Sequence, residues 1–186
     1  IENYWSKRSD DFFDLRIEEL KSDKRQLWQD EIIANLPDKE HLKILDVGCG
    51  PGFFSVILSS LGHDVIGIDL TESMIQKADE IADILDYDID FRVMNAQELD
   101  FDDEEFDVVI SRNLTWTLPD IEKAYKEWYR VLKKDGVLLN FDADYGKVSL
   151  KEEMKSLGEE HSHNMMDSSL VKECDDIKQE IGRAHV

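Results

Sequence analysis

Two carboxylates and a run of glycines are the residues of this chain whose types and spacing could do chemistry. Residues 44–54 read Ile-Leu-Asp-Val-Gly-Cys-Gly-Pro-Gly-Phe-Phe. The apolar start predicts a buried strand, and the glycines predict a tight turn into a helix whose first turn Pro51 would fit. The free backbone N–H groups of that helix N-terminus favour a polar or anionic ligand. Asp46, near the strand end, is costly to bury unless a partner or ligand uses it.

The second carboxylate, Asp69, lies nineteen residues beyond Gly50 and directly after the apolar residues of a second predicted strand. Nucleotide-binding α/β folds hold ribose hydroxyls with a carboxylate at the tip of this strand. An isolated Asp at a strand end usually caps the next helix. Its spacing from the glycine turn leads us to predict a ribose contact.

The pattern Asp-x-Gly-x-Gly-x-Gly that begins at Asp46 resembles the first motif of the class I S-adenosylmethionine-dependent methyltransferases. A dinucleotide fingerprint would instead need glycine where Phe53 stands. The resemblance implies S-adenosyl-L-methionine as the cofactor. It implies a binding site that includes Asp46, Gly48, Cys49, Gly50 and Asp69.

Further segments extend the resemblance toward the adenine ring. Asn95-Ala96-Gln97 stands where related enzymes commonly have Asp-Ala-Glu, and its amides can still donate and accept hydrogen bonds at the adenine edge. Leu70 and Met74 are expected to flank the ring, although a core position explains Met74 equally well.

The N-terminus carries aromatic and basic residues together, Tyr4-Trp5-Ser6-Lys7-Arg8. Many small-molecule methyltransferases of this class begin with a similar Tyr-Trp-x-x-Arg stretch that covers the cofactor. The resemblance implies that Tyr4 and Arg8 lie near the cofactor's carboxylate. The alternative is that Tyr4 and Trp5 only pack on the domain.

Residues 111–116 follow the fourth predicted strand and should lie over the transferable methyl group. They read Ser-Arg-Asn-Leu-Thr-Trp, without the Asn/Asp-Pro-Pro-Tyr of methyltransferases that act on exocyclic amines of bases. Arg112, Asn113 and Trp116 look like the loop of small-molecule enzymes resembling the quinone-biosynthesis methyltransferases. The resemblance implies a small-molecule acceptor and places Arg112 among the cofactor-binding residues. Trp116 either contacts substrate or sulfonium, or belongs to the core.

The sequence selects no catalytic residue. Asp142, Asp144 and Tyr145 follow the fifth predicted strand on the cofactor edge, and each could take a proton from the acceptor. His161 and His163 are two residues apart, which points them to different faces of a helix, so no metal site is expected.

The elements that must position these residues alternate between strand and helix. Apolar runs predict strands at residues 44–47, 65–69, 89–94, 106–110 and 137–141; helical spacing predicts one helix before Pro37 and a last one from residue 121 that Gly136 closes. The expected fold is α/β, doubly wound and Rossmann-like, with a mainly parallel five-stranded sheet of order 3-2-1-4-5 and helices on both faces.

We expect one methyltransferase domain over residues 1–186, with an N-terminal helical cap at 1–40, a cofactor-binding core at 41–145 and a C-terminal helical segment at 146–186. The family's usual terminal pair of strands has no counterpart here, which fits a fragment of a longer protein. Residues 137–141 would then form an open sheet edge, through which a homodimer is one expectation.

Composition bounds the environment and the partners. The 186 residues, 41% hydrophobic and 35% charged, indicate a soluble globular domain. Two cysteines without a disulfide framework fit a reducing cytoplasm, and the short apolar runs indicate no membrane association. A net charge of -21 would repel a phosphate backbone, so no nucleic-acid partner is expected.

The predicted function is therefore methyl transfer from S-adenosyl-L-methionine to a small molecule. One alternative is a non-catalytic domain that binds this cofactor, if the missing strands carried the substrate pocket. The other is a nicotinamide-dependent oxidoreductase, which would share the glycine turn and the ribose carboxylate but is disfavoured by Phe53 and Asp46.

Overall fold

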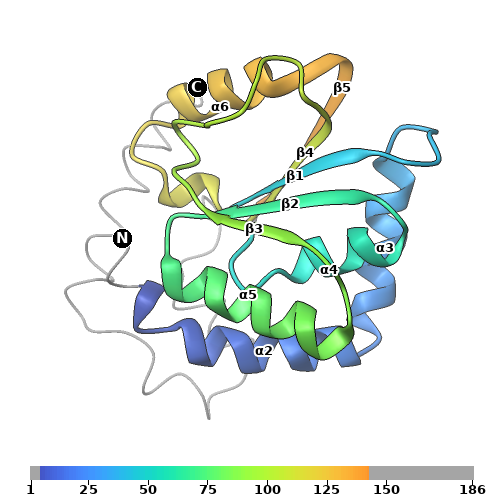
Figure 1. Ribbon diagram of the computed structural model, residues 1–186, viewed down its shortest axis with the longest axis vertical. Coiled ribbons are helices and arrows are strands. Elements are labelled where there is room, and N and C mark those ends of the chain that lie inside the picture. Colours follow the sequence, from blue (N-terminus) through green and yellow to red (C-terminus); the bar gives the residue numbers. More distant parts are fainter. Residues whose placement is uncertain (1–4, 143–186) are drawn as a thin grey trace. The chain divides into compact units, whose positions relative to one another are not determined.

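The computed structural model describes residues 5–142, which contain one sheet of five strands in the order β3-β2-β1-β4-β5 (Figure 1). Apart from Asp142, these residues belong to the first of the two units into which the chain divides, residues 1–141 and 142–186. Every pairing between neighbouring strands is parallel. The predicted strand order and the Rossmann-like fold are confirmed.

The strands grow out of the predicted apolar runs. They are β1 Lys43–Val47, β2 Asp64–Asp69, β3 Asp90–Val93, β4 Phe106–Arg112 and β5 Leu132–Phe141. The predicted start of β5 at residue 137 is wrong, because Leu132 already pairs with Phe106. The pairing then jumps to Val137 opposite Val108, so residues 133–136 bulge out of the ladder. Asp135, at φ 67°, turns the chain inside this bulge.

The helices are α2 Ser9–Lys21, α3 Lys24–Asn35, α4 Phe53–Ser60, α5 Glu72–Leu85 and α6 Ile121–Val131, with a 3-10 turn η1 at Thr115–Thr117. The single N-terminal helix predicted before Pro37 is two helices. Ser22 takes an extended backbone, and its hydroxyl donates to the Glu19 carbonyl at 2.9 Å, which ends α2. Helix α4 begins after the left-handed Gly52, so Pro51 lies in the turn before α4 and not in its first turn.

Helices cover both faces of the sheet, with α2 to α5 on one face and α6 on the other (Figure 1). Successive residues of a strand point to opposite faces, so Ile44 packs on the α4 side and Leu45 on the α6 side. The polar residues near the strand ends follow the same alternation. Asp46 bonds Ser55 of α4, whereas Ser111 bonds Asn140 on the α6 side.

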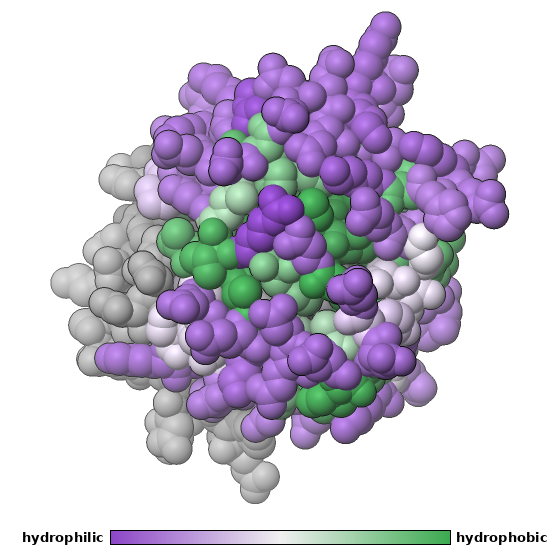
Figure 2. Space-filling model, viewed as in Figure 1, coloured by the Kyte–Doolittle hydropathy of each residue, from purple (hydrophilic) through white to green (hydrophobic). Residues whose placement is uncertain are grey.

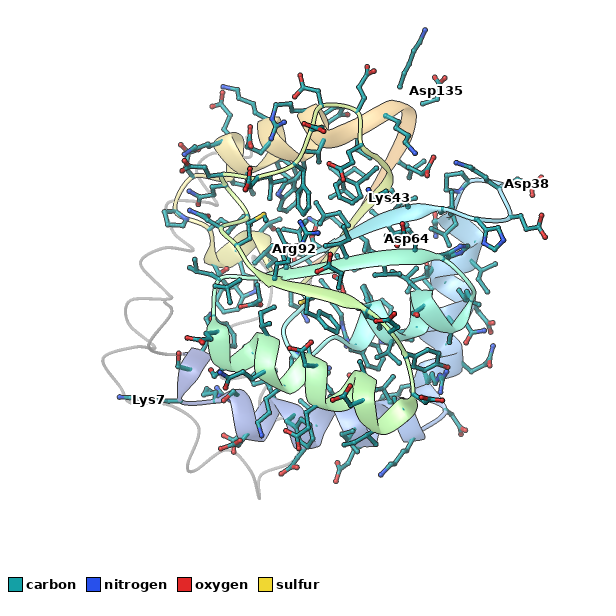
Figure 3. All side chains as sticks on the ribbon, viewed as in Figure 1. Lys7, Asp38, Lys43, Asp64, Arg92 and Asp135 are labelled. Atoms are coloured by element: carbon teal, nitrogen blue, oxygen red, sulfur yellow. The ribbon has the colours of Figure 1, made fainter. Side chains whose placement is uncertain are left out.

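Ion pairs and a backbone hydrogen bond connect residues at the amino ends of the strands. Figure 3 shows Lys43 and Asp64, which begin β1 and β2 and pair in register, at the same end of the sheet. Beside them Asp107 accepts hydrogen bonds from Lys39 Nζ at 2.8 Å, from Lys43 N at 2.9 Å and from Lys133 Nζ at 3.0 Å. Burial alone would raise the pKa of Asp107, but these donors lower it to about 2. Asp46, Asp69 and Arg112, at or near the ends of β1, β2 and β4, lie at the opposite, carboxyl end.

Strand β5 is an edge of the sheet within the described residues, as predicted. The predicted C-terminal helical segment, 146–186, lies outside the described residues. In the same view as Figure 1, Figure 2 shows a largely hydrophilic surface with apolar residues gathered near its middle. Among residues 5–142, no helix is long and apolar enough to cross a membrane.

Candidate functional site at the carboxyl end of the sheet

The glycine turn joins the carboxyl end of β1 to α4. Gly48, Gly50 and Gly52 have φ of 67°, 51° and 80°, a region in which side chains are strained. A Cβ on Gly48 would lie 2.7 Å from Leu114 Cδ1, and one on Gly52 would lie 2.9 Å from Phe91 Cζ. A Cβ on Gly50 would meet no described atom within 4 Å. The space over Gly50 is therefore where this turn can receive a ligand.

Asp69 ties the glycine turn to the tip of β2. Its Oδ2 accepts the N–H of Gly50 at 3.0 Å, and its Oδ1 accepts the N–H of Thr71 at 2.9 Å. The bond to Thr71 is the local capping role expected of an isolated Asp. The Thr71 hydroxyl also bonds this carboxylate, whose two oxygens offer about four acceptor sites, so room remains for a further hydroxyl donor. Burial raises the pKa of Asp69 although all three bonds lower it, so a ligand hydroxyl that donates to the carboxylate would favour its ionised form.

Asp46 lies beneath the turn on the α4 side. The residue is 2% exposed, and its Oδ2 accepts the Ser55 hydroxyl at 2.6 Å. Burial raises the pKa of Asp46 to about 7, although the hydroxyl and backbone N–H of Ser55 favour the ionised form. Asp46 therefore holds the first turn of α4 under the glycines, and its contact with the cofactor stays a prediction.

The buried Asp46 carboxyl should make stability depend on pH. Its folded pKa of about 7 exceeds the value of about 3.9 for an unfolded Asp. Between these values the folded state holds a proton that the unfolded state has lost, so the free energy of unfolding falls as pH rises. We expect Asp46→Asn to remove this component, measured by urea unfolding at about pH 5 and about pH 7.5. The exposed variant Asp11→Asn should keep the wild-type slope; equal slopes in wild type and Asp46→Asn would contradict the assignment.

The turn Asn95-Ala96-Gln97 is held by a residue of α6 and by Asp120, the residue before that helix. The Ala96 carbonyl accepts Trp128 Nε1 at 2.9 Å, and Gln97 Oε1 accepts the backbone N–H of Asp120 at 3.2 Å. The Asn95 side chain accepts the N–H of Gln97 at 3.0 Å. All three residues thus use oxygens to hold the turn, the Asn95 side chain is exposed, and the contacts of these residues with an adenine edge stay predictions.

The remaining predicted contacts near the turn differ in exposure. Leu70 is 45% exposed, whereas Met74 is only 3% exposed, which agrees with the core interpretation of Met74. Cys49 is buried, and its backbone N–H donates to the Ile68 carbonyl at 2.9 Å. Burial raises the pKa of the Cys49 thiol well above its ordinary value, which disfavours a nucleophilic thiolate.

The N-terminal segment reaches the loop after β4. The Trp5 ring lies edge-on to Trp116, with 6.3 Å between centroids, and also to Phe12, at 5.4 Å. Arg8 is buried with its guanidinium carbon 5.2 Å from the Phe12 ring centroid. Tyr4 lies outside the described residues. Trp5 thus packs on the domain, as the alternative expected, and the covering role of the segment and the cofactor contacts of Tyr4 and Arg8 stay predictions.

Arg112 has a partner that the sequence analysis missed. Its two Nη atoms donate to Glu19 of α2 at 2.8 and 3.3 Å. Its guanidinium carbon lies 4.5 Å from the Trp28 ring centroid and 4.9 Å from that of Phe53. The side chain is thus engaged by helices on the α4 face, and the cofactor contact of Arg112 stays a prediction. Glu19 follows Arg16 at helical spacing on one face of α2, the only sequence signal for this cluster.

A second polar group that the sequence analysis missed faces α6 at the ends of β4 and β5. The Ser111 hydroxyl donates to Asn140 Oδ1 at 2.6 Å, and Asn140 Nδ2 donates to the Tyr125 hydroxyl at 3.2 Å. Of the three candidate bases, Asp142 follows β5 directly, and Asp144 and Tyr145 lie outside the described residues. Within residues 5–142, no group of three or more His, Cys, Asp and Glu side chains could hold a metal ion.

Comparisons with known proteins agree with this arrangement. The ubiquinone/menaquinone biosynthesis C-methyltransferase UbiE of Rickettsia prowazekii is 35% identical over 144 residues, covering 73% of this chain and 57% of that protein. The crystal structure of the PH0226 protein from Pyrococcus horikoshii has 30% identity and a TM-score of 0.64, covering 75% of this chain and 61% of its own. A structure from Methanosarcina mazei titled as SAM-dependent methyltransferases has 35% identity and a TM-score of 0.54, covering 58% of this chain and 55% of its own.

The chain spans about half the length of the curated relatives it matches, from 46% to 57% in the first four. The family model described as "Methyltransferase domain" matches residues 45–140, just over half of the 186 residues. That range begins within β1 and ends within β5, so it contains the glycine turn, Asp69 and the loop after β4. The resemblance inferred from the motif at Asp46 is confirmed, and the chain belongs to the methyltransferase-domain family.

Proposed function

We propose that this chain transfers a methyl group from S-adenosyl-L-methionine to a small-molecule acceptor. The observation that carries the proposal is the space over Gly50, where no described atom lies within 4 Å of a Cβ, bordered by Asp69 at the carboxyl ends of β1 and β2. Doubly wound folds bind their ligands in the crevice outside these strand ends. Family membership supplies the type of reaction.

The proposed cofactor contacts divide by chemistry. Asp69 accepts the ribose hydroxyls, and the backbone of Gly48, Cys49 and Gly50 lies against the cofactor above Asp46. The adenine ring is flanked by Leu70 and Met74, with Asn95, Ala96 and Gln97 at its edge. Tyr4 and Arg8 are proposed near the amino-acid carboxylate, because Arg8 lies in the segment that meets Trp116 through Trp5.

The chain's own residues have mainly to hold the acceptor in line. S-adenosyl-L-methionine, when bound, supplies a methyl group that is already electrophilic. Orientation of the acceptor can then contribute roughly 7 to 11 kcal/mol to the rate. Asp69 fixes the glycine turn at Gly50, and the loop after β4 packs Leu114 over Gly48. Asp142, Asp144 and Tyr145 stay the three candidate bases for an acceptor that must lose a proton.

The acceptor class is proposed from the relatives' names. These include a C-methyltransferase and an O-methyltransferase of ubiquinone biosynthesis, so aromatic ring compounds with hydroxyl groups are the first acceptors to test. A cytoplasmic location, the absence of nucleic-acid and membrane partners, a single domain over residues 1–186 and a homodimer through residues 137–141 stay predictions.

The decisive experiment measures methyl release with a panel of small metabolites. Calorimetry with S-adenosylhomocysteine and NADH accompanies it, since an oxidoreductase would bind the nicotinamide. We expect S-adenosylhomocysteine to bind and NADH not to bind, and we expect turnover with at least one acceptor. Cofactor binding without turnover on any acceptor would favour a non-catalytic binding domain, and NADH binding would overturn the proposal.

The ribose assignment predicts the behaviour of Asp69→Ala. We expect S-adenosylhomocysteine binding to weaken by about 1.5 to 3 kcal/mol, the range for hydrogen bonds to a charged acceptor. Asp64→Ala is the matched control, because Asp64 is exposed at the opposite end of the same strand. Calorimetric titration of both folded variants decides the matter, and unchanged affinity in Asp69→Ala would defeat the assignment.

A further inference from the structure

We infer that the ion pair between Glu19 and Arg112 is a positioning clamp, which holds the N-terminal helices against the loop that borders the cofactor site. Both residues act through this contact and not by touching the cofactor. The inference deepens the proposed function, since it names what orders the proposed site.

The clamp joins four elements through one guanidinium. Arg112 ends β4, and it meets Glu19 of α2 with a two-pronged hydrogen bond. The same guanidinium carbon lies within 4.5 Å of the Trp28 centroid in α3 and 4.9 Å of the Phe53 centroid in α4. The side chains of Arg112 and Glu19 are only 17% and 8% exposed. Buried two-pronged pairs of this kind are geometrically specific.

The cluster depends on the charge of Glu19. Arg16 also donates to the Glu19 carboxylate. Burial alone would raise the pKa of Glu19, but the hydrogen bond from Arg112 and the charge of Arg16 outweigh it and lower the pKa. Loss of this carboxylate would leave two guanidiniums together in a buried setting, an arrangement that is strongly unfavourable.

The clamp reaches the site along the loop that follows Arg112. The next residue, Asn113, donates its N–H to the Phe141 carbonyl at 3.0 Å. Leu114 then lies over Gly48, and Trp116 meets Trp5 of the N-terminal segment. Both partners of the clamp are therefore linked to the covering segment: Glu19 through α2, and Arg112 through the loop.

Two neutral variants and their combination separate positioning from direct binding. We expect Glu19→Gln and Arg112→Gln each to weaken S-adenosylhomocysteine binding on the order of tenfold, and the double variant to be no worse than either. A direct ligand would behave otherwise, because Glu19→Gln would release the guanidinium and leave affinity equal or higher. Arg112→Lys keeps the charge without the two-pronged bond, and it replaces Arg112→Gln if that variant is too unstable to titrate.

Glu127→Gln is the matched control. Glu127 receives a comparable two-pronged bond from Arg130, at 3.0 and 2.9 Å, but within α6 on the other face of the sheet. We expect its affinity to stay within about twofold of wild type. A loss equal to that of Glu19→Gln would show a general effect of losing an ion pair and would overturn the inference.

Hydrogen exchange supplies a readout that does not depend on any ligand. Glu19→Gln should speed amide exchange in α2 and in residues 112–117, and leave β1 and α6 at wild-type rates. Uniformly faster exchange across these elements would indicate simple destabilisation and would overturn the clamp. If the wild type fails to bind S-adenosylhomocysteine, the proposed function falls, whereas this exchange pattern still decides for or against the clamp.

Discussion

Gly50→Val is expected to abolish S-adenosylhomocysteine binding while the chain stays folded. The new side chain would enter the space over the turn, where no described atom lies within 4 Å of a Cβ. No neighbour among residues 5–142 has to move, so the folded state bears mainly the strain of a branched residue at φ 51°, about 1 to 2 kcal/mol. A ligand in that space would be excluded. We expect affinity to fall at least about a hundredfold, or about 2.8 kcal/mol.

The control for Gly50→Val lies in the same protein. Gly62 has φ 85°, and a Cβ there would also meet no described atom within 4 Å. It stands two residues before β2, at the amino end of the sheet. Gly62→Val should therefore show comparable strain and normal binding. Calorimetry and urea unfolding of the two variants separate ligand exclusion from strain, and normal affinity in Gly50→Val would remove the turn from the proposed site.

Trp128→Ala should give the largest loss of stability among the variants considered. Trp128 is fully buried, and its ring lies edge-on to Tyr125 with 5.2 Å between centroids. Its Nε1 donates to the Ala96 carbonyl, the anchor of the 95–97 turn. Removal of a buried Trp side chain costs about 3 to 5 kcal/mol, which we expect to see in the free energy of unfolding measured with urea.

Two control variants are needed to interpret the stability of Trp128→Ala. Tyr129→Ala removes a large ring from the next residue of α6, but that residue is 71% exposed, so its stability should stay within about 0.5 kcal/mol of wild type. Trp128→Phe keeps most of the bulk and leaves the Ala96 carbonyl without its donor, at a cost of about 1 to 3 kcal/mol. A small loss in Trp128→Ala would contradict the role of α6 as the support of this turn.

Much of the framework could be predicted from the sequence, because it rests on local signals. The apolar run before the glycines favours a strand covered on both faces, and glycines permit the left-handed backbone that Gly48 and Gly50 have. Strands and helices that alternate along the chain restrict the topology to a parallel sheet. The strand order was therefore predicted correctly, as was the position of Asp69 at the tip of β2.

The errors in the elements have one tertiary and one local cause. The helix α6 stops at Val131 because Leu132 pairs with Phe106 in the sheet, although Gly136 looked like the stop signal. The N-terminal segment divides at Ser22 through a local contact, since the Ser22 hydroxyl ends α2 by binding the carbonyl of Glu19, three residues earlier. Both outcomes depend on contacts whose energy exceeds the small differences in helix propensity.

The sequence by itself determined that a glycine turn, a following carboxylate and a polar loop would meet at one end of a parallel sheet. Only the tertiary structure decided which face each side chain serves. Alternation along β4 turns Arg112 to the α4 face, where it meets Glu19, a partner 93 residues away. Neighbouring Ser111 turns the other way, to Asn140. The physical reason is that the two-residue period of a strand points neighbouring side chains to opposite faces of the sheet. Which residues they contact there depends on the helices packed against each face.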